Sequence, residues 1–178
     1  MLEKNNIKLR LLKPNKIDYK LLEKWYHEKD VYQNFEQRIL KYDEIVKKYK
    51  SRTSLNSNIP VFMIEYKNKP IGIIQYQLVN EENLQLYGLS NRNIYEIDIF
   101  IGEKNMQGIG IGTISINLLS TYLFNKKGAT SIIMCPLIKN EKAINCYKKC
   151  GFKIKKKFIT NDTIGNMQEY NLMIKQNI

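Results

Sequence analysis

Two hydrophobic periods recur along the chain, and their order predicts its elements. Alternate apolar positions, as in the run Ile7–Leu12, are typical of a half-buried strand, whereas apolar positions three or four apart, as at Tyr42, Ile45, Val46 and Tyr49, are typical of an amphipathic helix. We expect strands at residues 7–12, 61–66, 71–79, 94–101, 131–135, 152–158 and 167–174, and helices at residues 17–25, 42–49, 114–124 and 141–150.

The connections between these elements predict how they are arranged. Lys67-Asn68-Lys69-Pro70 is a turn sequence that would join two of the strands as an antiparallel hairpin, and the last two strands would form a terminal hairpin. Residues 33–40 fit neither period, and residues 80–93 have so little periodicity that we expect a long surface loop overhanging a site. The order of elements predicts a single α/β domain over residues 1–178, with a mixed central sheet flanked by helices.

A glycine-rich turn, Gln107-Gly108-Ile109-Gly110-Ile111-Gly112-Thr113, joins the fourth strand to the third helix. Glycines let backbone N–H groups approach a ligand closely, and a helix N-terminus adds free donors and a positive dipole end, so the turn predicts an anion site. It is not a P-loop, because Thr113 and Ile114 follow Gly112 where Lys-Ser/Thr would be required. The spacing GxGxG also differs from the GxGxxG of dinucleotide-binding folds.

The strand before this turn carries two acids on one face. Period-two alternation places Glu96, Asp98 and Phe100 together. The opposite face would carry Ile97, Ile99 and Ile101. A carboxylate beside an amine can orient it and accept its proton, although a solvated polar strand face would show the same pattern.

Composition excludes several classes of protein. A chain of 178 residues with 43% hydrophobic residues suits one ordinary domain. The first residues are polar and residues 109–124 are interrupted by hydroxyl and amide side chains, so we expect a cytoplasmic protein outside the membrane. The net charge of +12 comes from lysines spread along the chain without an arginine-rich arm, which favours a solvated surface over nucleic-acid binding.

The cysteines do not predict a metal or disulfide framework. Cys135, Cys146 and Cys150 are odd in number and contain no C-x-x-C pair, and His27 is the single histidine. Cys146 and Cys150 would share one face of a helix, where we interpret them as small buried hydrophobes in a reducing compartment.

The glycine-rich turn also contains Gln-x-x-Gly-x-Gly, read as Gln107, Gly110 and Gly112, and a second motif follows in residues 140–152, Asn-Glu-Lys-Ala-Ile-Asn-Cys-Tyr-Lys-Lys-Cys-Gly-Phe. Together they resemble the GCN5-related N-acetyltransferases (GNAT). Trp25, the segment 64–72 and the segment 97–103 are similar to the aminoglycoside 6′-N-acetyltransferase branch.

The resemblance implies a donor site for acetyl-CoA as cosubstrate, with no metal. The turn would bind the pyrophosphate through Gln107, Gly108, Ile109, Gly110, Ile111, Gly112 and Thr113. The backbone of Ile99, Phe100 and Ile101 would pair with the pantetheine arm, Asn140 would hydrogen-bond that arm, and Tyr147 would protonate the leaving thiolate. Asp98 would be the general base, with Glu96 as the weaker candidate.

The acceptor side matches the branch less well. Cys135, before Pro136, stands where relatives often have an aspartate that binds the drug, so a charge is missing there. The resemblance implies acetylation of the 6′-amine of an aminoglycoside, a small-molecule amine, by a monomer or homodimer. Other amines remain open, namely a polyamine, an amino sugar or a protein N-terminus, as does a non-catalytic module that binds acetyl-CoA or RNA.

Overall fold

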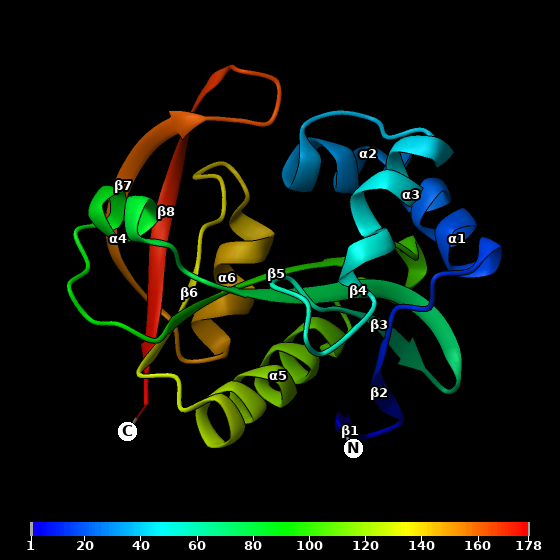
Figure 1. The fold of residues 1–178 in the computed structure, drawn as a ribbon, viewed down its shortest axis with the longest axis horizontal. Coiled ribbons are helices and arrows are strands. Elements are labelled where there is room, and N and C mark those ends of the chain that lie inside the picture. Colours follow the sequence, from blue (N-terminus) through cyan, green and yellow to red (C-terminus); the bar gives the residue numbers. More distant parts are fainter. Residues whose placement is uncertain (1, 178) are drawn as a thin grey trace.

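One eight-stranded sheet, in the order β1-β2-β3-β4-β5-β6-β8-β7, runs through the computed structural model, which describes residues 2–177 (Figure 1). Its strands are β1 (Leu2–Lys4), β2 (Ile7–Leu11), β3 (Val61–Tyr66), β4 (Lys69–Leu78), β5 (Ile94–Ile101), β6 (Ser131–Met134), β7 (Lys153–Asn161) and β8 (Met167–Gln176). Strands β5 and β6 are parallel, and the other neighbours are antiparallel. The predicted mixed sheet and both predicted hairpins are confirmed, whereas the predicted domain ends, residues 1 and 178, lie outside the described residues.

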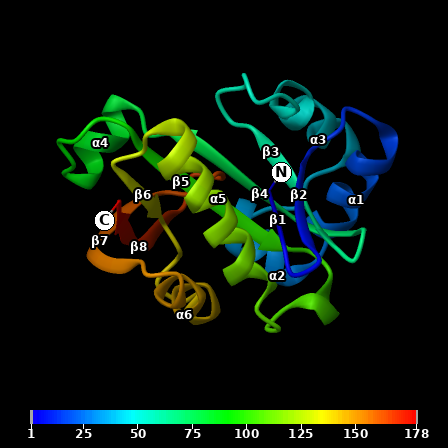
Figure 2. The same ribbon diagram turned by 90° about the horizontal axis from the view of Figure 1, so that it is seen from below.

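Helices cover both faces of the sheet (Figures 1 and 2). They are α1 (Lys16–Tyr26), α2 (Lys29–Val31), α3 (Tyr42–Tyr49), α4 (Glu81–Tyr87), α5 (Ile111–Lys127) and α6 (Glu141–Lys149), with the π-type turn η1 (Tyr32–Glu36) and the 3-10 turns η2 (Lys50–Arg52) and η3 (Lys104–Met106). The apolar sides of α5 and α6 pack on one face of the sheet, and those of α1 and α3 pack on the other. None of the helices within residues 2–177 has the length and apolar composition to cross a membrane.

The face covered by α1 and α3 has a gap in its apolar packing, and β5 crosses that gap. At one end of β5, Ile94 packs in a cluster with Leu84 and Tyr87 of α4. At the other end, Phe100 packs edge-to-face against Trp25, with ring centroids 6.2 Å apart. Strand alternation leaves two side chains of the same face between these clusters, those of Glu96 and Asp98.

Two glycines are required by close packing around this strand. A Cβ at Gly102 would lie 2.1 Å from the ring of Trp25, and a Cβ at Gly72 would lie 2.3 Å from the carbonyl oxygen of Phe100. Both positions belong to the segments that resemble the aminoglycoside branch. Their glycines therefore let the indole and the neighbouring strand approach β5 without displacement.

The prediction of a long loop over residues 80–93 is wrong, because α4 forms there. The side chain of Asn80 accepts a hydrogen bond from the Asn83 N–H at 2.9 Å, and Gly88, with φ of 62°, ends the helix. A helix of two turns is too short for its apolar period to stand out. Its cap residues, Asn80 and Gly88, were the signal in the sequence from which the helix could have been predicted.

Two further segments, both near the cavity described below, differ from what the sequence predicted. Helix α5 begins at Ile111 rather than at residue 114, so three residues of the glycine-rich segment form its first turn. Residues 33–40, which fitted no period, contribute to η1 and the chain that follows it, and Phe35 of this turn lies 4.9 Å from the ring of Phe100. Tertiary packing against β5 therefore holds a turn that has no periodic signal of its own.

Strands β5 and β6 separate partway along their length. Their pairing runs from Ile94 with Ser131 to Glu96 with Ile133, whereas β5 continues to pair with β4 as far as Ile101. Within residues 2–177, no strand pairs with the β6 side of β5 beyond Glu96. The second half of β5 therefore has an unpaired backbone edge inside the molecule.

Candidate active site

A cavity of about 930 Å³ lies where β5 and β6 separate. Most of the predicted site residues line it: Glu96, Asp98, Ile99, Phe100, Ile101, Gln107, Gly108, Gly110, Gly112, Thr113, Cys135, Asn140 and Tyr147. The side chain of Ile109 instead points to solvent with 60% exposure, and that of Ile111 is buried in the core. These two residues can offer only backbone groups to a ligand.

The glycine-rich turn presents free backbone donors to one end of the cavity. Gly110 caps α5 with φ of 88°, and the first intrahelical bond runs from the Ile114 N–H to the Gly110 carbonyl at 3.1 Å. The N–H groups of the three residues between them therefore have no carbonyl partner within the helix. A Cβ at Gly108 or Gly110 would meet no atom within 4 Å, so the space beside the turn is open to a ligand.

Gln107 ties this turn to the strand. Its side-chain amide donates a hydrogen bond to the carbonyl of Ile101 at 2.9 Å. The side-chain amide of Gln107 is thus engaged within the protein, and the turn's free donors are its backbone N–H groups. The glutamine fixes the distance between the helix N-terminus and the unpaired edge of β5.

Helix α6 supplies the opposite wall. The side-chain oxygen of Asn140 caps this helix by accepting from the Ala143 N–H at 3.2 Å, which leaves its NH₂ group as a donor. Tyr147 lies on the same helical face and is buried. Burial raises the pKa of the Tyr147 hydroxyl, so the phenol stays protonated and able to donate a proton.

The two carboxylates of β5 are each held by a glutamine of β4. Gln75 is the register partner of Asp98, and its amide donates to Asp98 Oδ2 at 3.0 Å. Gln77 pairs with Glu96 in the same way, with a bond of 3.0 Å to Oε2. Sequence reasoning missed both glutamines, although their period-two spacing within the predicted strand was a signal that they share one face.

Burial raises the pKa of both carboxyl groups. Desolvation, together with the neighbouring charge of Asp98, raises the pKa of Glu96 to about 7. Desolvation also raises the pKa of Asp98, against the opposing effects of the Gln75 hydrogen bond and the charges of Lys48 and Arg52. Glu96 can therefore take up a proton near neutral pH, and Asp98 binds a proton more readily than an exposed aspartate does.

The cations near Asp98 are partly engaged elsewhere. Lys48 forms an ion pair with Glu36, and Arg52 Nη1 lies 3.4 Å from the side-chain oxygen of Gln75. Arg52 thereby orients the glutamine so that its NH₂ group faces Asp98. This arrangement forms a polar chain from η2 through β4 to the middle of β5.

Cys135 stands where related enzymes often have an aspartate. In this structure it lies beside Glu96. The Glu96 carboxylate and the Tyr87 hydroxyl are neighbours of this thiol and influence its pKa. Burial, followed by the charge of Glu96, raises the pKa of Cys135, so it remains a neutral thiol. An acid is therefore present next to this position, but it comes from β5.

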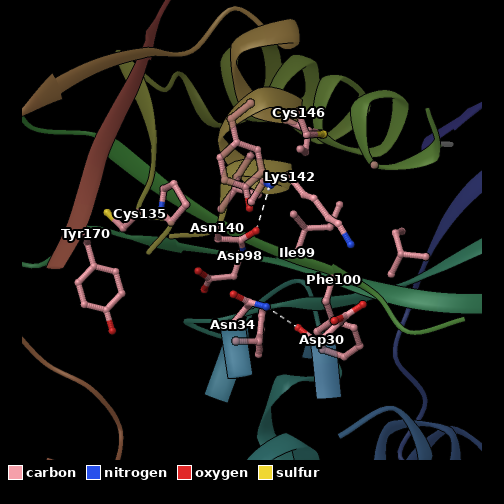
Figure 3. A pocket seen from close by; sticks show the side chains of 18 of the residues that line it. Asp30, Asn34, Asp98, Ile99, Phe100, Cys135, Asn140, Lys142, Cys146 and Tyr170 are labelled. Atoms are coloured by element: carbon pink, nitrogen blue, oxygen red, sulfur yellow. Dashed lines mark hydrogen bonds between the residues drawn. The ribbon is translucent and has the colours of Figure 1, made fainter. Parts of the chain in front are cut away.

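The wall of the cavity that faces Asp98, which we call the acceptor wall after the role proposed below, is formed by α2, η1 and the β7–β8 loop together with Tyr170 of β8 (Figure 3). Asp30 and Asn34 face Asp98 from α2 and η1, while Tyr170 projects from β8. Thr163, in the loop between β7 and β8, hydrogen-bonds the backbone carbonyl of Glu36 and so joins that loop to η1.

Charge is divided between the parts of the cavity. The acids in this part of the cavity are Asp30 and Asp162 of the acceptor wall and Glu96 and Asp98 of β5, which the wall faces. The cations that line the cavity, Lys139, Lys142 and Lys149, lie on α6 and the loop before it, together with Glu141. The acceptor wall is thus acidic although the whole chain is strongly basic. Among residues 2–177, no three His, Cys, Asp or Glu side chains gather closely enough to hold a metal ion.

Solved structures share this fold over nearly its whole length. One is the aminoglycoside acetyltransferase AAC(6′)-Ib with coenzyme A and kanamycin, at 20% identity, a TM-score of 0.75 and coverage of 96% of this chain and 95% of that one. Another is spermidine N-acetyltransferase from Vibrio cholerae with CoA and spermine, at 19% identity, a TM-score of 0.77 and coverage of 97% and 96%. The microcin C7 self-immunity acetyltransferase MccE, with acetyl-CoA and AMP, matches at 17% identity and a TM-score of 0.78, with coverage of 98% and 94%.

Sequence identities as low as these do not assign the chain to a family, but the match to a family model does. The model described as an acetyltransferase (GNAT) domain matches residues 15–160, which include α1, the glycine-rich turn, the acids of β5 and all of α6. The chain belongs to the GNAT family of acetyltransferases.

Proposed function

We propose that this protein uses acetyl-CoA to acetylate the 6′-amine of an aminoglycoside. The observation that carries the proposal is the division of charge in the cavity, with free backbone donors at one end and four carboxylates at the other. Phosphates suit the first end and a ligand with several ammonium groups suits the second. The proposed location is the cytoplasm.

The donor end fits the chemical groups of acetyl-CoA. The first turn of α5 would hold the pyrophosphate through the N–H groups of Ile111, Gly112 and Thr113, aided by the positive end of the helix dipole. The unpaired edge of β5 would bond the amides of the pantetheine arm as an added strand does, with the Asn140 amide as a further donor. Bound acetyl-CoA would supply an activated acetyl thioester near the middle of β5.

The chemical step requires a proton acceptor for the amine and a proton donor for the leaving sulfur. Asp98 projects into the cavity from β5 and would take the proton of the ammonium, directly or through water, with Glu96 able to share it. Tyr147, protonated because it is buried, would donate to the departing thiolate. Gln75 would keep the Asp98 carboxylate oriented during this exchange.

A polyamine is the second candidate acceptor, since the same four carboxylates would suit it and a spermidine acetyltransferase has a similar fold. The cavity of about 930 Å³ has room for a branched ligand with several rings as well as for a linear polyamine.

A turnover assay with purified protein and acetyl-CoA tests the proposal. Kanamycin, spermine and a peptide with a free N-terminus would be compared, with an aminoglycoside carrying a 6′-hydroxyl as the matched negative control. We expect single acetylation of kanamycin at the 6′-amine and an acceptor KM that rises with salt, because the carboxylates attract its charges. Turnover of spermine alone would identify a polyamine enzyme, and turnover of no amine would leave a binding module.

A further inference from the structure

A side-chain amide of η1 faces the proposed base across the cavity. Asn34 and Asp98 line the same cavity, and Figure 3 shows the two side chains facing each other from η1 and β5. Both residues are half-buried. The steps proposed above give Asn34 no role, although it lies opposite the carboxylate that would take the proton of the amine.

The orientation of this amide follows from one hydrogen bond. The Asn34 NH₂ group donates to the backbone carbonyl of Asp30 at 2.9 Å, drawn as a dashed line in Figure 3. A carbonyl oxygen can only accept, so the nitrogen of the amide, and not its oxygen, must point to Asp30. Among residues 2–177, no group donates a hydrogen bond to the side-chain oxygen of Asn34. That oxygen is therefore free to accept from a ligand in the cavity.

The turn that carries Asn34 is anchored to two other elements. Phe35, the next residue, packs edge-to-face on Phe100 of β5, with ring centroids 4.9 Å apart. Glu36 is buried and forms an ion pair with Lys48 of α3. These contacts fix η1 relative to β5, so the amide oxygen has a set position opposite Asp98.

An amine that is about to attack a thioester has two N–H bonds and one lone pair. If two acceptors hold the two N–H bonds, the lone pair points in the remaining direction, toward the acetyl carbon. Asp98 offers one acceptor and the Asn34 oxygen offers the other. The carboxylate can take a proton from nitrogen, whereas a neutral amide oxygen is too weak a base and can only hold its N–H.

We propose that Asn34 is a second amine-binding residue, whose side-chain oxygen holds the N–H bond that the acetylated product keeps, while Asp98 receives the proton that is lost. This inference rests on the proposed acetyl transfer, but not on which primary amine is acetylated.

The protons balance under this assignment. The ammonium passes one proton to Asp98, which returns it to solvent, and the freed lone pair forms the bond to the acetyl carbon. The nitrogen, now positively charged, loses its second proton to Asp98 as the C–S bond breaks. The electron pair of that bond leaves on sulfur, which takes a proton from Tyr147. Solvent then restores the proton of Tyr147 and removes that of Asp98, and the amide product keeps one N–H on the side of Asn34.

The assignment predicts a preference for a primary amine over its N-methyl derivative. A secondary amine has a single N–H, which must face Asp98 because it is lost, so the methyl group faces the Asn34 oxygen. The oxygen then loses contact with water and gains no donor, which is unfavourable. In Asn34→Leu, a side chain of nearly the same size, the methyl group meets an apolar surface and this penalty disappears.

The test is kcat/KM at saturating acetyl-CoA for kanamycin and for kanamycin methylated at its 6′-nitrogen. We expect the ratio of the primary to the N-methyl value to fall at least about tenfold in Asn34→Leu, mainly because the primary amine loses a charge-assisted hydrogen bond. Gln37→Leu is the matched control, since it removes another amide that lines the same cavity, and it should leave the ratio within about twofold. If the wild type acetylates spermine alone, spermine and spermine methylated at both terminal nitrogens replace the pair.

Acetyl-CoA affinity from calorimetry checks that the variants are folded, and Asn34→Ala should lower the ratio in the same direction as Asn34→Leu. A ratio that stays unchanged in folded Asn34 variants, even with a lower rate, would show that Asn34 only supports η1 and would overturn this inference alone. An equal fall of the ratio in Gln37→Leu would overturn it as well. Turnover of neither kanamycin nor spermine by the wild type would refute the proposed function and this inference together.

Discussion

Replacing Gln75 by leucine should reveal which carboxylate accepts the proton. The Gln75 amide donates a 3.0 Å hydrogen bond to Asp98, and the Gln75 side chain is buried while that of Asp98 is half-buried. Leucine is close to glutamine in size but offers no donor, so the charged form of Asp98 loses its bond while the packing of β4 is kept. The pKa of Asp98, already raised by burial, should rise further.

The magnitude follows from the bond that is lost. A hydrogen bond to a charged group contributes about 1.5–3 kcal/mol, and one pKa unit corresponds to about 1.4 kcal/mol. The acidic limb of the profile of kcat/KM against pH should therefore move upward by about one to two pH units in Gln75→Leu. At pH below this limb the variant should lose about tenfold or more in rate, and at high pH most of the rate should return.

Gln77→Leu is the matched control, because it removes a bond of the same length from Glu96 two residues away on the same strand. With Asp98 as the base, this variant should move the acidic limb less than Gln75→Leu does. The assay is acceptor kcat/KM between pH 5.5 and 9 at saturating acetyl-CoA, with donor affinity from calorimetry as the check on folding. If the acidic limb of the pH profile moves in Gln77→Leu but stays in place in Gln75→Leu, Asp98 is not the general base. Glu96 would then be the residue that accepts the proton.

Three further substitutions test the donor end, the base and the packing. Asp98→Asn should lower kcat at least about tenfold while leaving acetyl-CoA affinity within about twofold, and a wild-type pH profile would contradict a basic role. Gly110→Val should lower acetyl-CoA affinity at least about tenfold by calorimetry, because a branched residue at φ of 88° is strained and its side chain enters the open space beside the turn; unchanged affinity in folded protein would place the phosphate elsewhere. Gly102→Ala should lower stability by about 1–3 kcal/mol in thermal denaturation, because its Cβ would lie 2.1 Å from Trp25, and an unchanged melting temperature would contradict that packing.

The sequence was sufficient for the parts of the fold with a strong local period. Alternation along β5 predicted that Glu96 and Asp98 share a face, and the motif around Gly110 placed the helix N-terminus beside that strand. The partners of the two acids were not predictable in the same way. A cross-strand pair depends on register, and a shift of one residue would have turned Gln75 and Gln77 to the other face.

The acceptor wall was the least predictable part of the site for a related physical reason. The turn η1 has no hydrophobic period, and it is held by the ring of Phe35 against Phe100 and by the loop that contains Thr163. Both contacts join residues that are far apart in the chain. The position of Cys146 against the first turn of α5 was equally hidden, since the helical spacing of two cysteines predicted only their burial.

The two ends of the cavity are built from different kinds of structure, and this has a consequence for how such an enzyme can evolve. The donor end depends on β5, α5 and α6, where substitutions disturb the core, whereas the acceptor wall depends on η1 and the β7–β8 loop at the periphery. Mutations can therefore accumulate in the wall and exchange one amine for another while the acetyl donor stays the same.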